Sequence, residues 1–263
     1  MATPVALTPR GSGIPIFAVH NGAGSAYPYV PIARALGPNQ PFYAFQQFEL
    51  NKYNKPLPSV DVMAEEYLNA VRSIRPTGPY AFAGMCSTGT YVAYEMAQRA
   101  RALGEQVQLV VLLDPMNDEV VQLCLEGQML IDQALDVVGH IKELPNSHSR
   151  IPSLRLKLAN LVTALGLEPT MLELSPSLLA QFFELFASNH HASLHYSPRP
   201  YPGRAVIFFP SVSDDGNQLF PDVQWKTLAP TAEMHSISIN RNELYSDLGT
   251  ITYIAATISA ALR

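Results

Sequence analysis

Short apolar runs alternate with amphipathic stretches over the first 115 residues, and this alternation constrains the fold more than any other feature. Four runs, bounded by Gly or Pro, have the length of buried strands: 14–20, 41–47, 79–85 and 106–115. Stretches with helical spacing accompany them at 29–37, 60–76 and 90–104. The last run, QVQLVVLLDP, is apolar almost throughout, which is typical of a parallel strand covered on both faces. This order predicts an α/β fold, with a mostly parallel sheet and helices on both faces.

The pattern changes after Asp114. Residues 117–190 show no strand signal and contain helical stretches at 119–141, 155–166 and 176–191. Strand signals resume at 203–211 and 233–239, and a helix at 245–262 closes the chain. A helical insertion within an α/β domain is typical of a lid. We therefore expect four parts: a flexible leader (1–12), the first part of the core (13–116), a helical lid (117–200) and the second part of the core (201–263). We expect Phe182, Phe183 and Phe186 to belong to the core of the lid.

Composition excludes several classes of protein. The net charge is −5 and Lys and Arg do not cluster, so we expect no nucleic-acid partner. The chain has no run of about 18 apolar residues and no secretory signal pattern, so we expect no membrane association. The two cysteines, Cys86 and Cys124, argue against a disulfide scaffold or a zinc site and favour a reducing, cytoplasmic setting. We expect no bound metal and no bound cofactor.

The turn between the strand at 79–85 and the following helix carries two neighbouring nucleophiles, Cys86 and Ser87. A nucleophile at such a strand-to-helix turn needs small residues two positions before and after it. These positions are Gly84 and Thr88 for Cys86, but Met85 and Gly89 for Ser87. The turn therefore favours Cys86, and a helix N-terminus lowers the pKa of a cysteine and supplies N–H groups to an oxyanion. The alternative is that Cys86 is a small buried hydrophobic residue.

The run GPYAFAGMCSTGTYVAYEMA resembles the α/β-hydrolase thioesterase domains that end nonribosomal peptide and polyketide synthetases. The runs IPIFAVHNGAGSAYPYVPIARALGPNQPFYAF, VQLVVLLDP and YSPRPYPGRAVIFF extend the resemblance from about residue 13 to the C-terminus. It implies an α/β-hydrolase fold with a helical lid. It also implies an acyl or peptidyl carrier protein as partner, which delivers a small-molecule acyl chain on 4′-phosphopantetheine. The elbow nucleophile would accept that chain and release it by cyclisation, condensation or hydrolysis.

The resemblance also assigns site residues. Asp114 would be the orienting acid, and the alternative is a carboxylate that closes the turn before Pro115. Asp214 and Asp215 are alternative acids. Backbone N–H groups for the oxyanion would come from Asn21, Gly22, Ala23 and Ser87. The chain has one residue more than the family between GPY and VAYEMA. Counting from the strand places the nucleophile at Cys86, and counting back from the helix places it at Ser87.

A histidine is missing where the family has its base, because Arg241 occupies that place. His20, in the HNGAG turn, is a candidate replacement, as is the group His190, His191 and His195, whereas His235 is expected to pack in the sheet. A serine depends on a base more strongly than a cysteine does, which again favours Cys86.

The missing base leaves three functions open. Cyclisation or condensation becomes more attractive than hydrolysis, because water would lack activation; condensing domains of this family occur in synthetases that make aryl quinones and furanones. The first alternative is a catalytically degraded, α/β-hydrolase-like acyl-binding or docking module, although the retained turn, elbow and Asp114 argue against it. The second alternative is a free-standing editing thioesterase, whose relatives keep a full triad.

Overall fold

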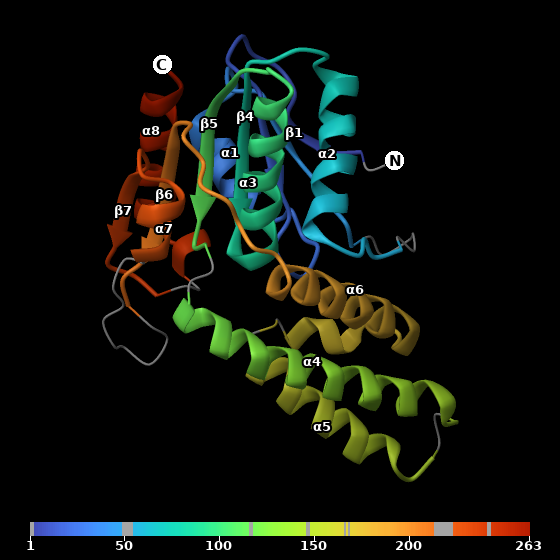
Figure 1. Cartoon of the computed structure of the whole chain (residues 1–263). Coiled ribbons are helices and arrows are strands. Elements are labelled where there is room, and N and C mark those ends of the chain that lie inside the picture. Colours follow the sequence, from blue (N-terminus) through green and yellow to red (C-terminus); the bar gives the residue numbers. More distant parts are fainter. Residues whose placement is uncertain are drawn as a thin grey trace.

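A single twisted sheet forms the centre of the protein (Figure 1). The computed structural model describes residues 3–48, 55–115, 118–145, 148–165, 167, 169–212, 223–240 and 243–263, except the side chains of 118–125 and 223. Within these residues the sheet has seven strands in the order β1-β3-β2-β4-β5-β6-β7. The strands are β1 (Val5–Thr8), β2 (Ile16–Val19), β3 (Phe42–Ala44), β4 (Tyr80–Met85), β5 (Val107–Leu113), β6 (Ala205–Pro210) and β7 (Glu233–Ile237). All neighbours are parallel except β1 and β3, which confirms the predicted fold class.

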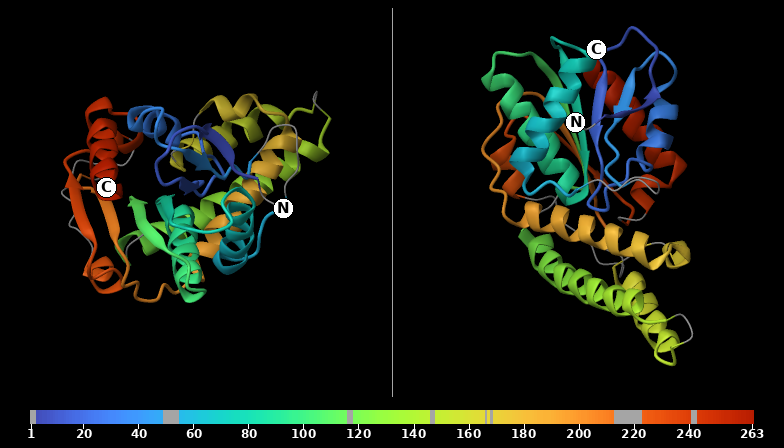
Figure 2. Two further views of the ribbon diagram at one scale, coloured as in Figure 1. Left: turned by 90° about the horizontal axis from the view of Figure 1, so that it is seen from above. Right: turned by 90° about the vertical axis from the view of Figure 1, so that its right-hand side faces the viewer.

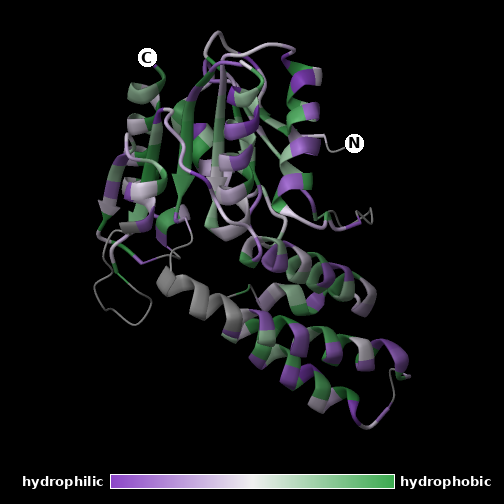
Figure 3. Cartoon of the chain, viewed as in Figure 1, coloured by the Kyte–Doolittle hydropathy of each residue, from purple (hydrophilic) through white to green (hydrophobic). Residues whose placement is uncertain are grey.

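Helices cover both faces of the sheet (Figure 2). On one face lie α2 (Val60–Ile74), α3 (Cys86–Ala102) and α7 (Val223–Leu228), and on the other lie α1 (Tyr29–Leu36) and α8 (Leu248–Leu262). Strands β2, β4 and β6 are buried along their whole length. The central strands are accordingly hydrophobic, whereas α2 also carries hydrophilic residues (Figure 3). Burial on both faces explains why the strands are continuous apolar runs without alternation.

An all-helical insertion separates β5 from β6, as the sequence pattern predicts. It consists of α4 (Asp118–Glu143), α5 (Ile151–Ala164), the 3₁₀ turn η1 (Pro169–Glu173) and α6 (Pro176–Leu194). It lies beyond the carboxyl ends of the strands (Figures 1 and 2). Its helices bury a hydrophobic core of their own, in which Phe182 and Phe183 are buried and against which Phe186 packs, as expected. No helix in the described part of the chain is long and apolar enough to cross a membrane.

The N-terminal segment differs from the prediction of a flexible leader over residues 1–12. Val5–Thr8 forms the edge strand β1, which pairs antiparallel with β3, and Thr8 Oγ1 donates to Gln40 O at 2.9 Å. The prediction is wrong for these residues because a four-residue edge strand carries too little apolar pattern to be recognised. Its partner strand supplies the hydrogen bonds that hold it.

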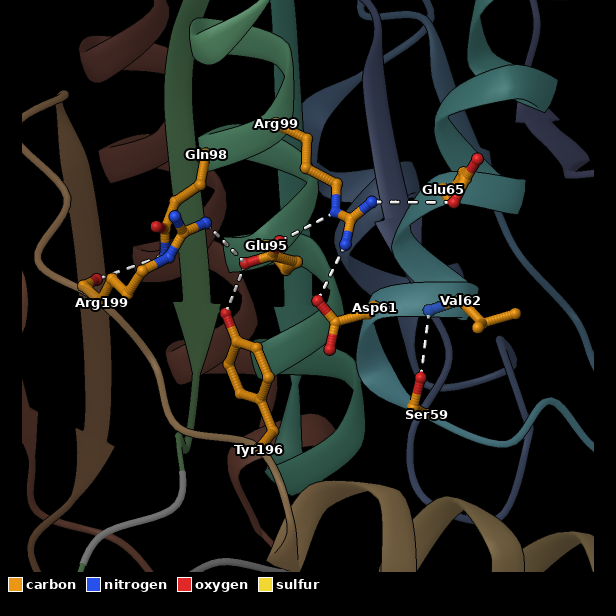
Figure 4. A network of polar contacts seen from close by, with 9 residues as sticks. All are labelled: Ser59, Asp61, Val62, Glu65, Glu95, Gln98, Arg99, Tyr196 and Arg199. Atoms are coloured by element: carbon orange, nitrogen blue, oxygen red, sulfur yellow. Dashed lines mark hydrogen bonds and ion pairs between the residues drawn. The ribbon is translucent and has the colours of Figure 1, made fainter.

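A polar network fixes the chain that leaves the insertion (Figure 4). Glu95 of α3 is buried and accepts a hydrogen bond from Tyr196 Oη at 2.7 Å and one from Arg99 Nε at 2.8 Å. Arg99 also reaches Asp61 of α2 at 2.8 Å, and Arg199 lies 3.6 Å from Glu95. Burial and the bond to Glu95 raise the pKa of Tyr196, so its hydroxyl stays protonated and donates. The network joins α2, α3 and the segment after α6.

Candidate active site

The turn between β4 and α3 has the geometry of a nucleophile elbow, and its special residue is Cys86. β4 ends at Met85 and α3 begins at Cys86, whose φ is 55°. Few residues other than glycine adopt this left-handed conformation, and it costs about 1–3 kcal/mol. A Cβ added to Gly84 would overlap the carbonyl oxygen of Gly89, and one added to Gly89 would overlap His20 O. The small positions around the turn are thus Gly84 and Gly89, while Ser87 lies inside the first turn of α3.

Sheet topology brings several candidate residues to one edge. β2 and β4 are neighbours, whereas β3, which lies between them in sequence, pairs on the other side of β2. Ligands of open α/β sheets bind at such a switch point, beyond the carboxyl ends of the strands. Asn21 follows β2, Cys86 follows β4 and Asp114 follows β5, so all three reach this edge. Cys86 is half-buried there, beside the N-terminus of α3.

Asp114 is the residue directly after β5. It is buried, its φ is 52°, and its N–H donates to Phe208 O of β6 at 2.8 Å. Its charge acts on the hydroxyl of Tyr245, whose pKa is raised well above its usual range by burial first and then by Cys86 and Asp114. Asp214, Asp215 and Arg241 lie outside the described residues.

Tyr245 is a site residue that sequence reasoning missed. It ends the 3₁₀ turn η2 (Glu243–Tyr245), which follows β7. Its Oη lies 3.5 Å from Cys86 Sγ and donates to Leu113 O, also at 3.5 Å. It therefore joins the elbow to the end of β5, one residue before Asp114. Tyr245 stands 159 positions after Cys86 in the chain, so no local sequence pattern links the two residues. The only signal in the sequence is a tyrosine in a polar loop.

His20 has other partners than the elbow. Its Nε2 lies 2.7 Å from Tyr67 Oη and its Nδ1 lies 2.8 Å from Asn21 O, and the side chain is fully buried. Burial lowers its pKa from 6.5 to about 4, so the ring is neutral near pH 7. Tyr67 belongs to the core on the α2 face, whereas Cys86 packs against the core on the α1 and α8 face. These contacts do not favour the predicted role of His20 as base.

The remaining candidate histidines also bond to other groups. His190 Nδ1 lies 3.1 Å from Gln128 Oε1 in α4, and burial lowers its pKa. His191 of α6 and His195, directly after it, are exposed, and their rings meet edge to face. His235 lies in β7, as predicted, and its Nδ1 is 2.7 Å from Tyr253 Oη.

The turn after β2 is held from inside and from the insertion. The N–H of Asn21 donates to Ser25 O at 3.2 Å, so it is engaged within the turn. Gly22 lies close to the first turn of α3, because a Cβ on it would be 3.8 Å from Thr88 Oγ1. Ala23 packs against the core of the insertion. Among the residues that the sequence predicts to bind an oxyanion, Gly22 therefore lies near the start of α3, whereas the N–H of Asn21 is already bound to Ser25 O within the turn.

A buried polar cluster connects this turn to α6, and sequence reasoning did not find it. Asn189 Nδ2 donates to Gly22 O at 3.0 Å and to Gln47 Oε1 at 2.7 Å. Thr88 Oγ1 donates to Asn189 O at 3.1 Å and lies 2.8 Å from Ser193 Oγ. The two contacts of Thr88 join α3 to α6, and the two bonds of Asn189 Nδ2 join α6 to Gly22 and Gln47. The insertion is therefore anchored beside the elbow.

The fold and the elbow define a class of protein, the α/β-hydrolase type of enzyme. The family model of the thioesterase domain matches residues 14–201, so the chain belongs to the thioesterase domain family. It is 37% identical over 112 residues to malpibaldin synthetase of Mortierella alpina, which covers 43% of this chain and 2% of that protein. It is 38% identical over 110 residues to atromentin synthetase of Tapinella panuoides, which covers 42% of this chain and 11% of that protein. The chain thus matches only small parts of these relatives.

A solved structure shows the same fold. The NocB thioesterase domain, in a covalent complex with a fluorophosphonate nocardicin G analogue, superposes with a TM-score of 0.68 at 22% identity, over 100% of both chains. Family and fold together identify the chain as a thioesterase-type enzyme domain.

Proposed function

We propose that this chain is the product-releasing thioesterase domain of a synthetase similar to nonribosomal peptide synthetases, with Cys86 as its nucleophile. The observation that carries the proposal is the φ of 55° at Cys86, flanked by two glycines that have no room for a Cβ. A strained turn of this kind persists where it presents a side chain for chemistry. A small acyl chain on the 4′-phosphopantetheine arm of an acyl or peptidyl carrier protein is the proposed substrate. The low cysteine count favours a cytoplasmic setting.

The first step is a thioester exchange. The Cys86 thiolate attacks the carbonyl carbon, a new C–Sγ bond forms, and the bond to the pantetheine sulfur breaks. The pantetheine leaves as a thiolate and takes up the proton that Cys86 lost. The N–H groups of Ser87, Gly22 and Ala23 are the proposed donors to the oxyanion, and the N-terminus of α3 adds its positive dipole end.

The second step releases the chain. A nucleophile carried by the acyl chain, or by a second acyl chain in a condensation, attacks the carbonyl carbon of the Cys86 thioester and forms a new bond to it. The C–Sγ bond breaks, and the sulfur takes up the proton that the nucleophile loses. We favour cyclisation or condensation over hydrolysis, because residues 236–250 contain no histidine that could activate water. Asp114 is the proposed acid of the site, acting beside the Tyr245 hydroxyl. The insertion, with proposed bounds 117–200, is the lid over the acyl chain, and 13–116 and 201–263 form the core.

Covalent loading tests the proposal. The wild type and the variants Cys86→Ala and Ser87→Ala are incubated with acyl-pantetheine thioesters, and the mass of the intact protein is measured. The wild type and S87A are expected to gain the acyl mass, and C86A is not. Loading of C86A but not S87A would identify Ser87 as the nucleophile instead.

A second measurement separates an enzyme from an acyl-binding module. If no protein is acylated, and a thiol electrophile labels Cys86 no faster than Cys124, the site is not preorganised and the enzymatic proposal fails. Selective labelling of Cys86 in the folded protein, lost in urea, supports it.

A further inference from the structure

Tyr245 is partly buried, and its hydroxyl lies between Cys86 and Leu113. Its Oη is 3.5 Å from Cys86 Sγ and 3.5 Å from the carbonyl oxygen of Leu113. Sulfur hydrogen bonds are longer than those to oxygen, so the contact with Cys86 has a full hydrogen-bond length. The tyrosine packs against the core on the α1 and α8 face, together with Cys86 itself. The packing of η2 and the elbow therefore place the tyrosine and Cys86 against the same core.

We infer that Tyr245 is a positioning residue that donates a hydrogen bond to the thiolate of Cys86 and so raises the share of the reactive form. The inference rests on the proposed function, since it concerns the nucleophile of that site. In this view the Cys86 sulfur is activated by a hydrogen-bond donor and not by a general base.

Tyr245 is suited to donate and not to accept a proton. Burial and the nearby negative groups, Cys86 and Asp114, raise its pKa well above the usual range, so its hydroxyl keeps its hydrogen near neutral pH. While Cys86 is a thiol, this hydrogen can go to Leu113 O. When the sulfur ionises, the same hydrogen turns to it, because a charged acceptor makes the stronger hydrogen bond. The thiolate is stabilised without any movement of the backbone.

The other groups around Cys86 do not supply this bond. Tyr29 of α1 interacts electrostatically with Cys86, but its hydroxyl donates to Val19 O at 2.9 Å. Asp114, after β5, carries a negative charge and opposes ionisation of the thiol. The N-terminus of α3 favours it. Among the described residues that face the sulfur, Tyr245 is therefore the hydroxyl placed to bond it.

The pH dependence of alkylation tests the inference. Iodoacetamide reacts with the thiolate, and mass spectrometry of the Cys86 peptide gives the rate at each pH. In Tyr245→Phe the midpoint is expected to rise by about one pH unit, with an unchanged plateau at high pH. The matched control is Tyr253→Phe, which removes the hydroxyl that bonds His235 and should leave the Cys86 midpoint in place. An unchanged midpoint in folded Y245F would overturn the inference.

A second variant covers the case in which Y245F does not fold. Site-specific replacement of Tyr245 by 3-fluorotyrosine keeps the ring and makes the hydroxyl a better donor, so the midpoint is expected to fall. A midpoint that stays in place contradicts the inference again. Acyl loading of the wild type is measured in parallel. Loading at Cys86 with no effect of Tyr245 refutes this inference alone, whereas a shifted midpoint without any loading refutes the proposed function alone.

Discussion

Asn189 ties the helical insertion to the turn after β2, and its replacement gives a quantitative test of the structure. The side chain is fully buried, and its Nδ2 donates to Gly22 O at 3.0 Å and to Gln47 Oε1 at 2.7 Å. In Asn189→Ala two buried oxygens lose a donor, and each such loss costs about 1–3 kcal/mol. The Oδ1 of Asn189, which has no hydrogen-bond partner within the described residues, disappears as well and offsets part of this loss. We therefore expect the free energy of unfolding to fall by about 3 kcal/mol.

Urea unfolding measures this change, with the fluorescence of Trp225 as the signal. Trp225 is the single tryptophan of the chain and is fully buried against α3, so its emission reports loss of the core. The matched control is Gln98→Ala, which removes an exposed amide that donates to Arg199 O at 3.2 Å. This variant should stay within about 0.5 kcal/mol of the wild type. If N189A unfolds as Q98A does, Asn189 does not hold the turn, and the buried cluster has no energetic importance.

Two further predictions concern the elbow and its neighbour. Gly84→Ala should destabilise the protein by about 3 kcal/mol in the same assay, because the added Cβ would lie 2.6 Å from Thr90 Cα. Gly139→Ala is the control: it lies on an open face of α4 and should stabilise the protein by about 0.5–1 kcal/mol. Equal effects of the two substitutions would contradict the geometry of the elbow. The pKa of His20 is 6.5 in the unfolded chain and about 4 in the folded protein. Between pH 6.5 and pH 4 the unfolded chain therefore binds a proton at His20 that the folded protein does not, and the folded state loses stability. The wild type should therefore lose about 3 kcal/mol of stability between pH 7 and pH 4 relative to His20→Gln, and parallel curves would refute the buried, neutral ring.

The sequence determined the architecture because strand and helix signals are local. Nearly continuous apolar runs such as 106–115 are typical of strands that are buried on both faces, so the sequence predicted the parallel sheet and its helical layers. The helical insertion followed from the absence of such runs between Asp114 and residue 190. The edge strand Val5–Thr8 could not be predicted from the sequence, because its stability comes from its partner β3 and not from its own residue pattern.

Only the tertiary structure decided how the candidate site is assembled. Two sequence registers left Cys86 and Ser87 open, and the backbone resolved which one holds the strained turn, since φ and the close approach of Gly84 to Gly89 are properties of packed chains. His20 is of a residue type that often serves as a catalytic base, yet both of its ring nitrogens are engaged, one by Tyr67 and the other by Asn21. Tyr245 and Asn189 reach the elbow region from positions far along the chain, through contacts that no local pattern encodes. The signals for strands and helices lie in neighbouring residues of the sequence, whereas a site is assembled from residues that are neighbours only in space.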